Sequence, residues 1–196
     1  LGTIDNHKPW IGRERWLRRY EPEPYHGIHE RAAWPKNLGM TPGSMKCNEV
    51  PQPRDLRRIN AIYDSDISYQ DAELGRLIKQ LDEWGIGNET MVIITADHGE
   101  ELWEHGICGH GASLREPLVW VPLLIHYPPL FPGGRVVSEG VEGVDILPTI
   151  IDAIGRSPLD GAQGHSLIPL AQGQIGGYPM PSYASQYEYA HAMRLG

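Results

Sequence analysis

Apolar residues recur at three- and four-residue steps between Asp55 and Trp84, and this is the longest regular pattern in the chain. Such steps return to one face of a helix, so the pattern predicts a long amphipathic helix. Gly85 follows where a helix commonly ends. The apolar positions are Ile59, Ile62, Tyr63, Ile67, Leu74, Leu77, Ile78, Leu81 and Trp84.

Two short apolar runs predict strands. MVII at residues 91–94 follows the turn GIGNET and is wholly apolar, which is typical of a strand covered on both faces. VPLLIHY at residues 121–127 predicts a second buried strand, and GRVVS at residues 134–138 predicts a short third one. A helix, a tight loop and a buried strand in that order indicate an α/β fold with a largely parallel sheet.

A second helix is predicted in EGVDILPTIIDAIG, with Asp145 as its N-cap, Pro148 in its first turn and Gly155 at its end. Residues 10–53, in contrast, show no sustained period and are rich in Pro, Gly, Trp and Tyr. Irregular segments of this length are often lids or binding loops. We predict an ordered excursion near a site; a loop that packs on the sheet for stability is the alternative.

Composition narrows the class of protein. The 196 residues, 40% hydrophobic and 21% charged, suit a globular domain, and no apolar run reaches the length of a membrane span. The net charge of −8 disfavours binding to nucleic acid, and we interpret the basic segment RERWLRRY as a solvated face. Cys47 and Cys108 form no CxxC pair, so no disulfide is predicted and the cellular compartment stays open.

The chemistry concentrates in TADHGEELWEHGICGHG, residues 95–111, which holds three histidines, four acids and four glycines. Asp97 and His98 directly follow the predicted strand, and ligands gather beyond the carboxyl ends of strands in open α/β sheets. An adjacent carboxylate and imidazole can bind one divalent ion. The glycines permit positive φ angles and a close approach of backbone to ligand. The alternative is a set of exposed or core-filling histidines without a ligand.

This stretch and the VPLLI that follows it resemble the sulfatases of the alkaline phosphatase superfamily, including their phosphonate monoester hydrolase relatives. TIDNHKPW is similar to the family's Asp-Pro-His-x-Pro-Trp segment, with Asn6 in place of the usual proline. VEGVDILPTIIDAIG and GHSLIPL resemble its downstream helix and loop. The resemblance implies an alkaline phosphatase-like sandwich with a mostly parallel central sheet flanked by helices. Residues 1–196 are then a partial catalytic domain, with an αβ core over residues 55–170.

The resemblance also implies roles for single residues. Asp97 and His98 would be ligands of a divalent cation, Ca²⁺ or Mn²⁺ in the first place, with Zn²⁺ as a further option. His7 and His110 would contact the transferred sulfuryl or phosphoryl group, and His110 stands where many relatives have lysine. Histidine can replace lysine there, although over a narrower pH range. Glu100 and Glu116 are expected to orient neighbouring groups, and His105 either does so or structures the loop.

One part of the family pattern is absent from the sequence. Sulfatases attack with a formylglycine made from a cysteine in Cys-x-Pro/Ala-x-Arg, and other members use Ser or Thr. Neither cysteine of the chain is followed by that pattern, and the family's N-terminal aspartates have no counterpart. We therefore expect an internal or C-terminal piece of a larger domain, inactive by itself and prone to self-association through an exposed sheet edge.

The sequence thus predicts part of a metal-dependent hydrolase that cleaves sulfate esters of small molecules or carbohydrates. A hydrolase of phosphonate or phosphate esters from the same superfamily is one alternative. A non-catalytic module that binds a metal or an anion is another, and a purely structural interaction domain is a third.

Overall fold

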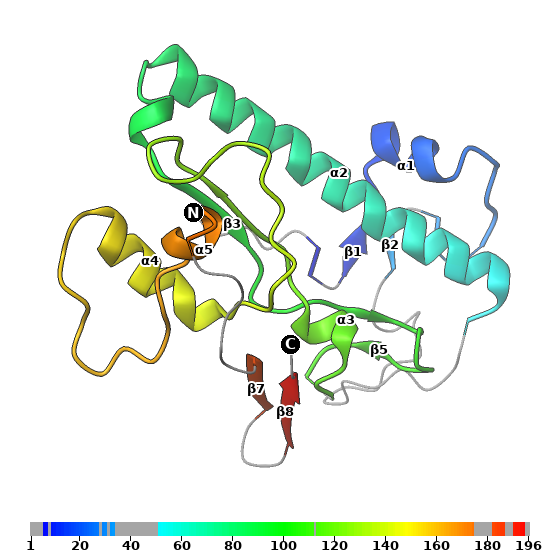
Figure 1. The fold of residues 1–196 in the computed structure, drawn as a ribbon. Helices are drawn as coiled ribbons and strands as arrows, with labels where there is room; N and C mark the ends of the chain where they lie inside the picture. The colour runs from blue at the N-terminus through cyan, green and yellow to red at the C-terminus, as the bar shows by residue number, and fades with distance from the viewer. Residues whose placement is uncertain are drawn as a thin grey trace. The chain divides into compact units, whose positions relative to one another are not determined.

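The computed structural model describes residues 6–7, 9–27, 29–30, 32–33, 51–111, 113–174, 182–186 and 190–194. The chain divides into two compact units (Figure 1). The first unit comprises residues 1–84 and 98–112, and the second comprises residues 85–97 and 113–196. Among the described helices, none has both the length and the apolar character that a membrane crossing requires.

The first unit is built on α2 (Pro53–Glu83), a helix of 31 residues that confirms the long amphipathic pattern. It begins two residues before Asp55, where the predicted segment starts, because Pro53 suits the first helical turn. Gly85 follows the last turn with φ of 74°, a conformation that glycine adopts without strain. The prediction of where this helix ends is confirmed.

Only the first half of α2 carries the core. Its buried apolar residues pack with side chains from β1, α1 and the segment around residue 103, and the cluster consists of Trp10, Leu17, Ile59, Ala61, Ile62, Trp103 and Cys108. Farther along the predicted stripe, Ile67, Leu77 and Trp84 are exposed. The period therefore predicts the helix correctly, while burial is confined to one half of it.

The predicted irregular segment contains regular structure. It holds β1 (Trp10–Ile11), α1 (Glu14–Tyr20) and β2 (Ala32–Ala33), with β1 and β2 paired antiparallel. β1 and α1 lie against α2 (Figure 1). The expectation of an irregular chain is wrong for α1, because a helix of seven residues with one buried residue, Leu17, is too short to show a period. Residues 34–50 lie outside the described residues.

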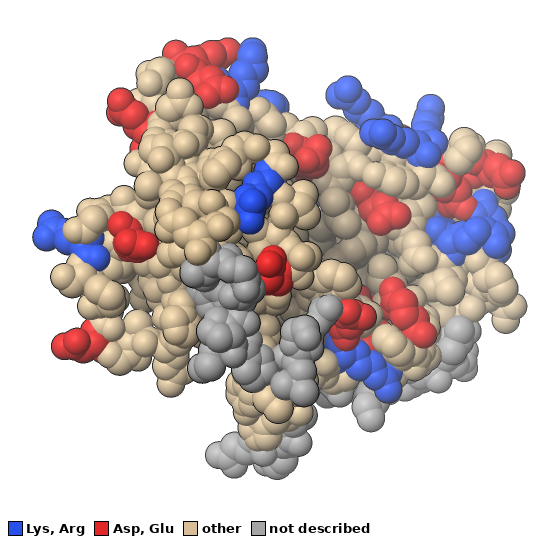
Figure 2. All heavy atoms as spheres, in the orientation of Figure 1, with Lys and Arg blue, Asp and Glu red and all other residues tan. Residues whose placement is uncertain are grey.

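The basic segment RERWLRRY forms α1, and its charges face outward. Arg15, Arg18 and Arg19 are exposed, and Arg18 pairs with Glu14 of the same helix. Figure 2 shows these basic side chains gathered over α1. This arrangement agrees with the interpretation of the segment as a solvated face.

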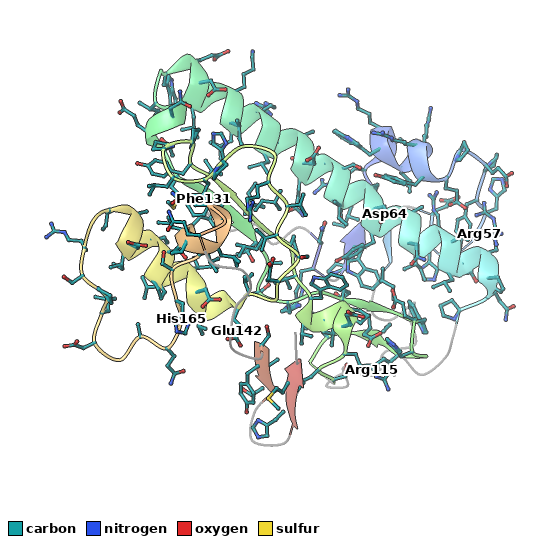
Figure 3. All side chains as sticks on the ribbon, in the orientation of Figure 1. Arg57, Asp64, Arg115, Phe131, Glu142 and His165 are labelled. Carbon is teal, nitrogen blue, oxygen red and sulfur yellow. The ribbon has the colours of Figure 1, made fainter. Side chains whose placement is uncertain are left out.

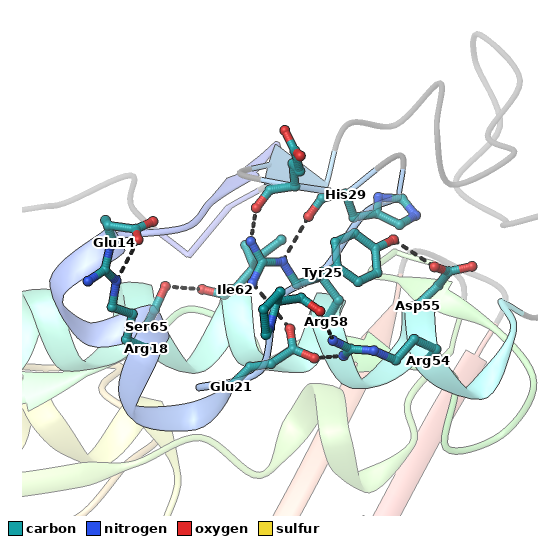
Figure 4. A network of polar contacts seen from close by, with 12 residues as sticks. Glu14, Arg18, Glu21, Tyr25, His29, Arg54, Asp55, Arg58, Ile62 and Ser65 are labelled. Carbon is teal, nitrogen blue, oxygen red and sulfur yellow. Dashed lines mark hydrogen bonds and ion pairs between the residues drawn. The ribbon is translucent and has the colours of Figure 1, made fainter.

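A buried polar network joins the segment after α1 to the start of α2 (Figure 4). Arg58, which is buried, donates to the Glu21 carboxylate at 3.2 Å and to the backbone carbonyls of residues 29 and 30. Tyr25 donates to Asp55 at 2.6 Å. Burial above all, together with this carboxylate, raises the pKa of Tyr25 to about 12. The phenol therefore stays a donor, and the network ties Glu21, Tyr25 and the backbone of residues 29 and 30 to α2.

The second unit contains the two predicted strands. β3 (Val92–Thr95) pairs antiparallel with β6 (Leu123–His126). The expectation that both strands are covered on both faces is wrong in the described structure, where β3 is half-buried and Leu124 is exposed. All strand pairs among the described residues are antiparallel, namely β1–β2, β3–β6, β4–β5 and β7–β8. A mixed helix and strand architecture is thus observed.

The remaining elements of the second unit are short. They are η2 (Gly87–Glu89), α3 (Glu116–Val119), η3 (Gly143–Asp145), α4 (Ile146–Ala153), α5 (Ile168–Ala171), β7 (Ser182–Gln186) and β8 (Ala190–Arg194). Gly155 ends the predicted helix with φ of 67°. The strand predicted in GRVVS is wrong, since these residues form no element and Val136 is 90% exposed.

Asp145 has a different role from the predicted one. It precedes α4, but its side chain does not cap that helix. The buried carboxylate accepts hydrogen bonds from the backbone N–H of Glu142 and of His165, each at 2.8 Å, and so joins two distant segments beside the start of α4 (Figure 3). Gly164 permits this approach, because a Cβ there would lie 2.2 Å from the carbonyl oxygen of Val144.

Candidate active site

The predicted chemistry of the first unit rests on a small hairpin. β4 (Glu101–Leu102) pairs antiparallel with β5 (Cys108–Gly109), with Glu101 opposite Gly109 and Leu102 opposite Cys108. Gly106, Gly109 and Gly111 have φ between 74° and 89°, as expected, whereas Gly99, the fourth glycine of this stretch, does not have a positive φ. The hairpin therefore has a backbone that few other residues could form.

Trp103 anchors the hairpin to the core. It has φ of 71°, which is unusual for a bulky residue, and its side chain is buried in the cluster beside α2. A left-handed residue of this kind costs on the order of 1–3 kcal/mol and persists only where the surroundings fix it. Burial of the indole supplies that constraint, so the tip of the hairpin is held against α2.

Three histidine rings lie together in the first unit. The ring of His110 is 4.2 Å from that of His98 and 5.0 Å from that of His7, measured between ring centroids. His110 also pairs with Glu100, whose Oε1 is 2.9 Å from its Nδ1. The structure thus brings together both residues predicted to contact the transferred group and one predicted metal ligand.

His98 has a defined tautomer. Its Nδ1 lies 2.8 Å from the carbonyl oxygen of Gly99, so Nδ1 must donate, and the lone pair of the neutral ring lies on Nε2. An imidazole oriented in this way suits a metal ligand. Asp97, the residue before it, follows β3 and is exposed.

Asp97 ends a segment of the second unit and His98 begins one of the first. By chemical type, a carboxylate and an imidazole are both suitable ligands for a divalent cation. Within the described ranges, no three His, Cys, Asp or Glu side chains converge as a metal-holding group. The assignment of Asp97 and His98 as ligands of a divalent cation therefore stays a prediction.

The other predicted residues lie elsewhere. His105 pairs with Glu101 at 3.0 Å across the tip of the hairpin, which supports the loop-structuring alternative. Glu116 begins α3 in the second unit, where the helix dipole stabilises a negative charge in the first turn. The positions of His105 and Glu116 therefore each have a structural explanation.

The charge of Glu100 also affects Tyr63 of α2. Burial above all, and then the charge of Glu100, raise the pKa of Tyr63 to about 12. The phenol is therefore neutral over the whole working pH range. Its ring forms a T-shaped pair with that of Trp10 in the core beside α2.

Cys108 corrects an expectation. No disulfide was predicted, but Cys108 is disulfide-bonded. Cys47, the chain's other cysteine, lies outside the described residues. The wide separation of the two cysteines in sequence gave no spacing signal. The bond lies in β5, two residues before His110, and restrains the strand that leads to it.

Asn6 has a backbone conformation that accounts for the difference between TIDNHKPW and the family segment. It has φ of 67°, which proline cannot adopt because its ring holds φ near −65°. Asparagine tolerates this conformation better than most residues. The backbone that presents His7 is thus matched to asparagine rather than to the usual proline.

We expect Asn6→Pro to displace His7, whereas Asn6→Gly, the matched control, keeps the same φ without strain. Proline in an incompatible conformation should cost about 1–3 kcal/mol of local stability. Chemical shifts of the His7 and His110 rings, which contact each other, would report the change. Equal ring shifts in both variants would contradict the role of the left-handed backbone.

Comparison with known proteins adds further evidence on the family of the chain. The family model described as Sulfatase matches residues 1–156. Arylsulfatase K of Danio rerio is 39% identical over 116 residues, which is 59% of this chain and 22% of that protein. The chain thus spans about a fifth of the length of this curated relative.

Two solved structures are also similar. The phosphonate monoester hydrolase SpPMH from Silicibacter pomeroyi has a TM-score of 0.63 and 29% identity, covering 70% of this chain and 27% of that chain. BT1596, a 2-O GAG sulfatase, has a TM-score of 0.57 and 26% identity, covering 70% of this chain and 31% of that chain.

Proposed function

Because the chain belongs to the sulfatase family, we propose that it forms part of a catalytic domain that hydrolyses sulfate esters. The observation that carries the proposal is the contact of His110 with His7 and His98, beside the buried carboxylate of Glu100. Grouped imidazoles can bind an anionic group and deliver a proton to it. Hydrolysis of an anionic ester with a basic leaving oxygen benefits from both.

In this proposal each histidine has one task. His7 binds the non-bridging oxygens of the ester. His110, protonated on both ring nitrogens for this step, gives the proton of Nε2 to the leaving oxygen and keeps the proton of Nδ1 toward Glu100. Asp97 and His98 would hold a divalent cation, which supplies positive charge to the nucleophile and the anionic oxygens when bound. The sequence leaves open which cation this is. The nucleophile, expected to be formylglycine, is not among these 196 residues in its family pattern.

We further propose a sugar or other small-molecule sulfate as the substrate, in view of the likeness to a glycosaminoglycan sulfatase. The likeness to a phosphonate monoester hydrolase supports a second candidate, a hydrolase of phosphonate esters. Both reactions need binding of charged non-bridging oxygens, but a sulfate ester has three of them on sulfur, whereas a phosphonate monoester has two on phosphorus together with a P–C bond.

The open edges of β3 and β6 support a proposal for the fold. Only two strands pair there in the described residues, and their outer backbone groups suit further strands. We propose that they belong to a mostly parallel central sheet in a longer protein, with residues 1–196 as part of the catalytic domain. The 196-residue chain alone is expected to self-associate through these edges.

We expect the full-length protein to hydrolyse a nitrophenyl sulfate and a sugar sulfate in the presence of a divalent cation. The 196-residue chain alone is the control and should give no turnover, because it lacks the nucleophile pattern. Hydrolysis of a phenylphosphonate ester in preference to both sulfates would favour the second candidate. Metal binding without turnover of any ester would identify a non-catalytic module instead.

A further inference from the structure

Glu100 and His110 face each other because of the hairpin register. In the β4–β5 pair, residues 101 and 102 lie opposite residues 109 and 108. Extending this antiparallel register by one residue places residue 100 opposite residue 110. Side chains directly opposite in such a pair are close enough to interact. The contact between the two side chains is thus dictated by the backbone and does not depend on a flexible loop.

Glu100 is also buried, with only 3% of its side chain exposed, whereas the side chain of His110 is 20% exposed. A buried carboxylate is costly unless a partner satisfies it. Its Oε1 lies 2.9 Å from Nδ1 of His110 and so holds the ring from the inner side. Nε2, the other ring nitrogen, is not engaged by Glu100.

A carboxylate oxygen is an acceptor, so Nδ1 of His110 is the donor in this contact. This keeps one proton on Nδ1 and fixes the plane of the ring, so the proton that His110 gives to the leaving oxygen is a second one, carried on Nε2. The neighbouring rings of His98 and His7 lie at interplanar angles of 32° and 57° to it. The orientation of His110 is therefore set by Glu100 and packed by two further rings.

We propose that Glu100 is a positioning residue for His110, which turns Nε2 of that ring toward the leaving oxygen of the ester. This inference rests on the proposed hydrolysis of sulfate esters. Glu100 touches neither substrate nor cation in this role. It restricts the imidazole to one orientation. A lysine at this position would need no such restraint, because its ammonium group can donate in several directions.

The hairpin contains a matched control. Glu101 is the next residue, its side chain is 0% exposed, and it also pairs with a histidine, His105, at 3.0 Å. The side chain of His105 is 43% exposed, and neither residue of this pair is assigned to the reaction. Glu101 thus shares burial, charge and type of contact with Glu100 but holds a different ring.

The test compares Glu100→Ala, Glu100→Gln and Glu101→Ala in the full-length protein, with a sugar sulfate and a nitrophenyl sulfate. Loss of a carboxylate that orients a functional histidine commonly costs about 10- to 100-fold. We expect Glu100→Ala to lower kcat by that factor for the sugar sulfate and much less for the nitrophenyl sulfate, with KM unchanged. Glu100→Gln should recover most of the loss, because its amide oxygen can still accept from Nδ1. Glu101→Ala should leave the ratio of the two kcat values unchanged.

The outcomes separate the two levels of inference. An active wild type whose kcat ratio is unaffected by Glu100→Ala would overturn the positioning role alone. An equal loss for both esters that Glu100→Gln does not recover would also overturn it, since that pattern belongs to a structural role. A wild type inactive on every ester would refute the proposed function. In that case ¹⁵N spectra of the neutral His110 ring still test the contact with Glu100, because they show which ring nitrogen carries the proton. A proton on Nε2 in place of Nδ1 would disprove the contact.

Discussion

We expect His110→Ala to lower kcat/KM for an alkyl or sugar sulfate by about 10²- to 10⁴-fold, the usual contribution of general acid catalysis. A basic leaving oxygen needs a proton as the bond breaks, and His110 lies beside His7 and His98 where it can supply one. A nitrophenolate is a much better leaving group and needs little such help. The loss for a nitrophenyl ester should therefore be far smaller. Comparing the two esters in wild type and variant measures the effect.

A simple anion-binding role for His110 makes the opposite prediction. The anionic oxygens are the same in both esters, so the loss would be equal, and a ratio unchanged by the mutation would rule out proton donation. His110→Lys, which restores the residue of many relatives, should recover part of the loss. His105→Ala is the matched control, because that histidine pairs with Glu101 in the same hairpin.

The second large effect concerns the metal. Asp97→Asn and His98→Ala should each lower metal content and activity together, because each removes one ligand. Loss of a ligand weakens binding more than loss of a residue that only orients one, so we expect more than about 100-fold in affinity. Elemental analysis and activity, measured on the same preparation of full-length protein, give both quantities.

Matched controls exist for both variants. Asp82→Asn changes an exposed carboxylate near the end of α2, and His105→Ala removes a histidine of the same hairpin. Neither should alter the metal content. If Asp97→Asn and His98→Ala retained the metal content of the wild type, the assignment of these residues as ligands would be wrong.

The sequence predicts the type of the elements α2 and β3 well and the burial of their side chains poorly. The stripe of α2 and the run of β3 are confirmed as a helix and a strand, because each pattern depends on local geometry. Their burial depends on partners far away in the chain, and the described structure leaves Leu77 and Leu124 exposed. For the same reason the short α1 escaped prediction, since one buried leucine makes no pattern.

The candidate site follows a similar division. The sequence motif and the resemblance single out His7, His98 and His110, and the structure brings their rings together. The specific pairing of Glu100 with His110 could not be read from the residues alone. It depends on which residue of β4 faces which residue of β5, and a shift of one position would exchange the partners.

The hairpin register also limits changes in chain length at this place. A single deletion or insertion between residues 103 and 107 that slid β5 by one position would set Glu100 opposite Gly109 or Gly111. Neither glycine has a side chain, so the buried carboxylate would lose its imidazole without any substitution in the site. Libraries that vary the length of this tip should therefore yield few active variants. Libraries that vary its composition at constant length, with Trp103 and Gly106 kept, should yield many more.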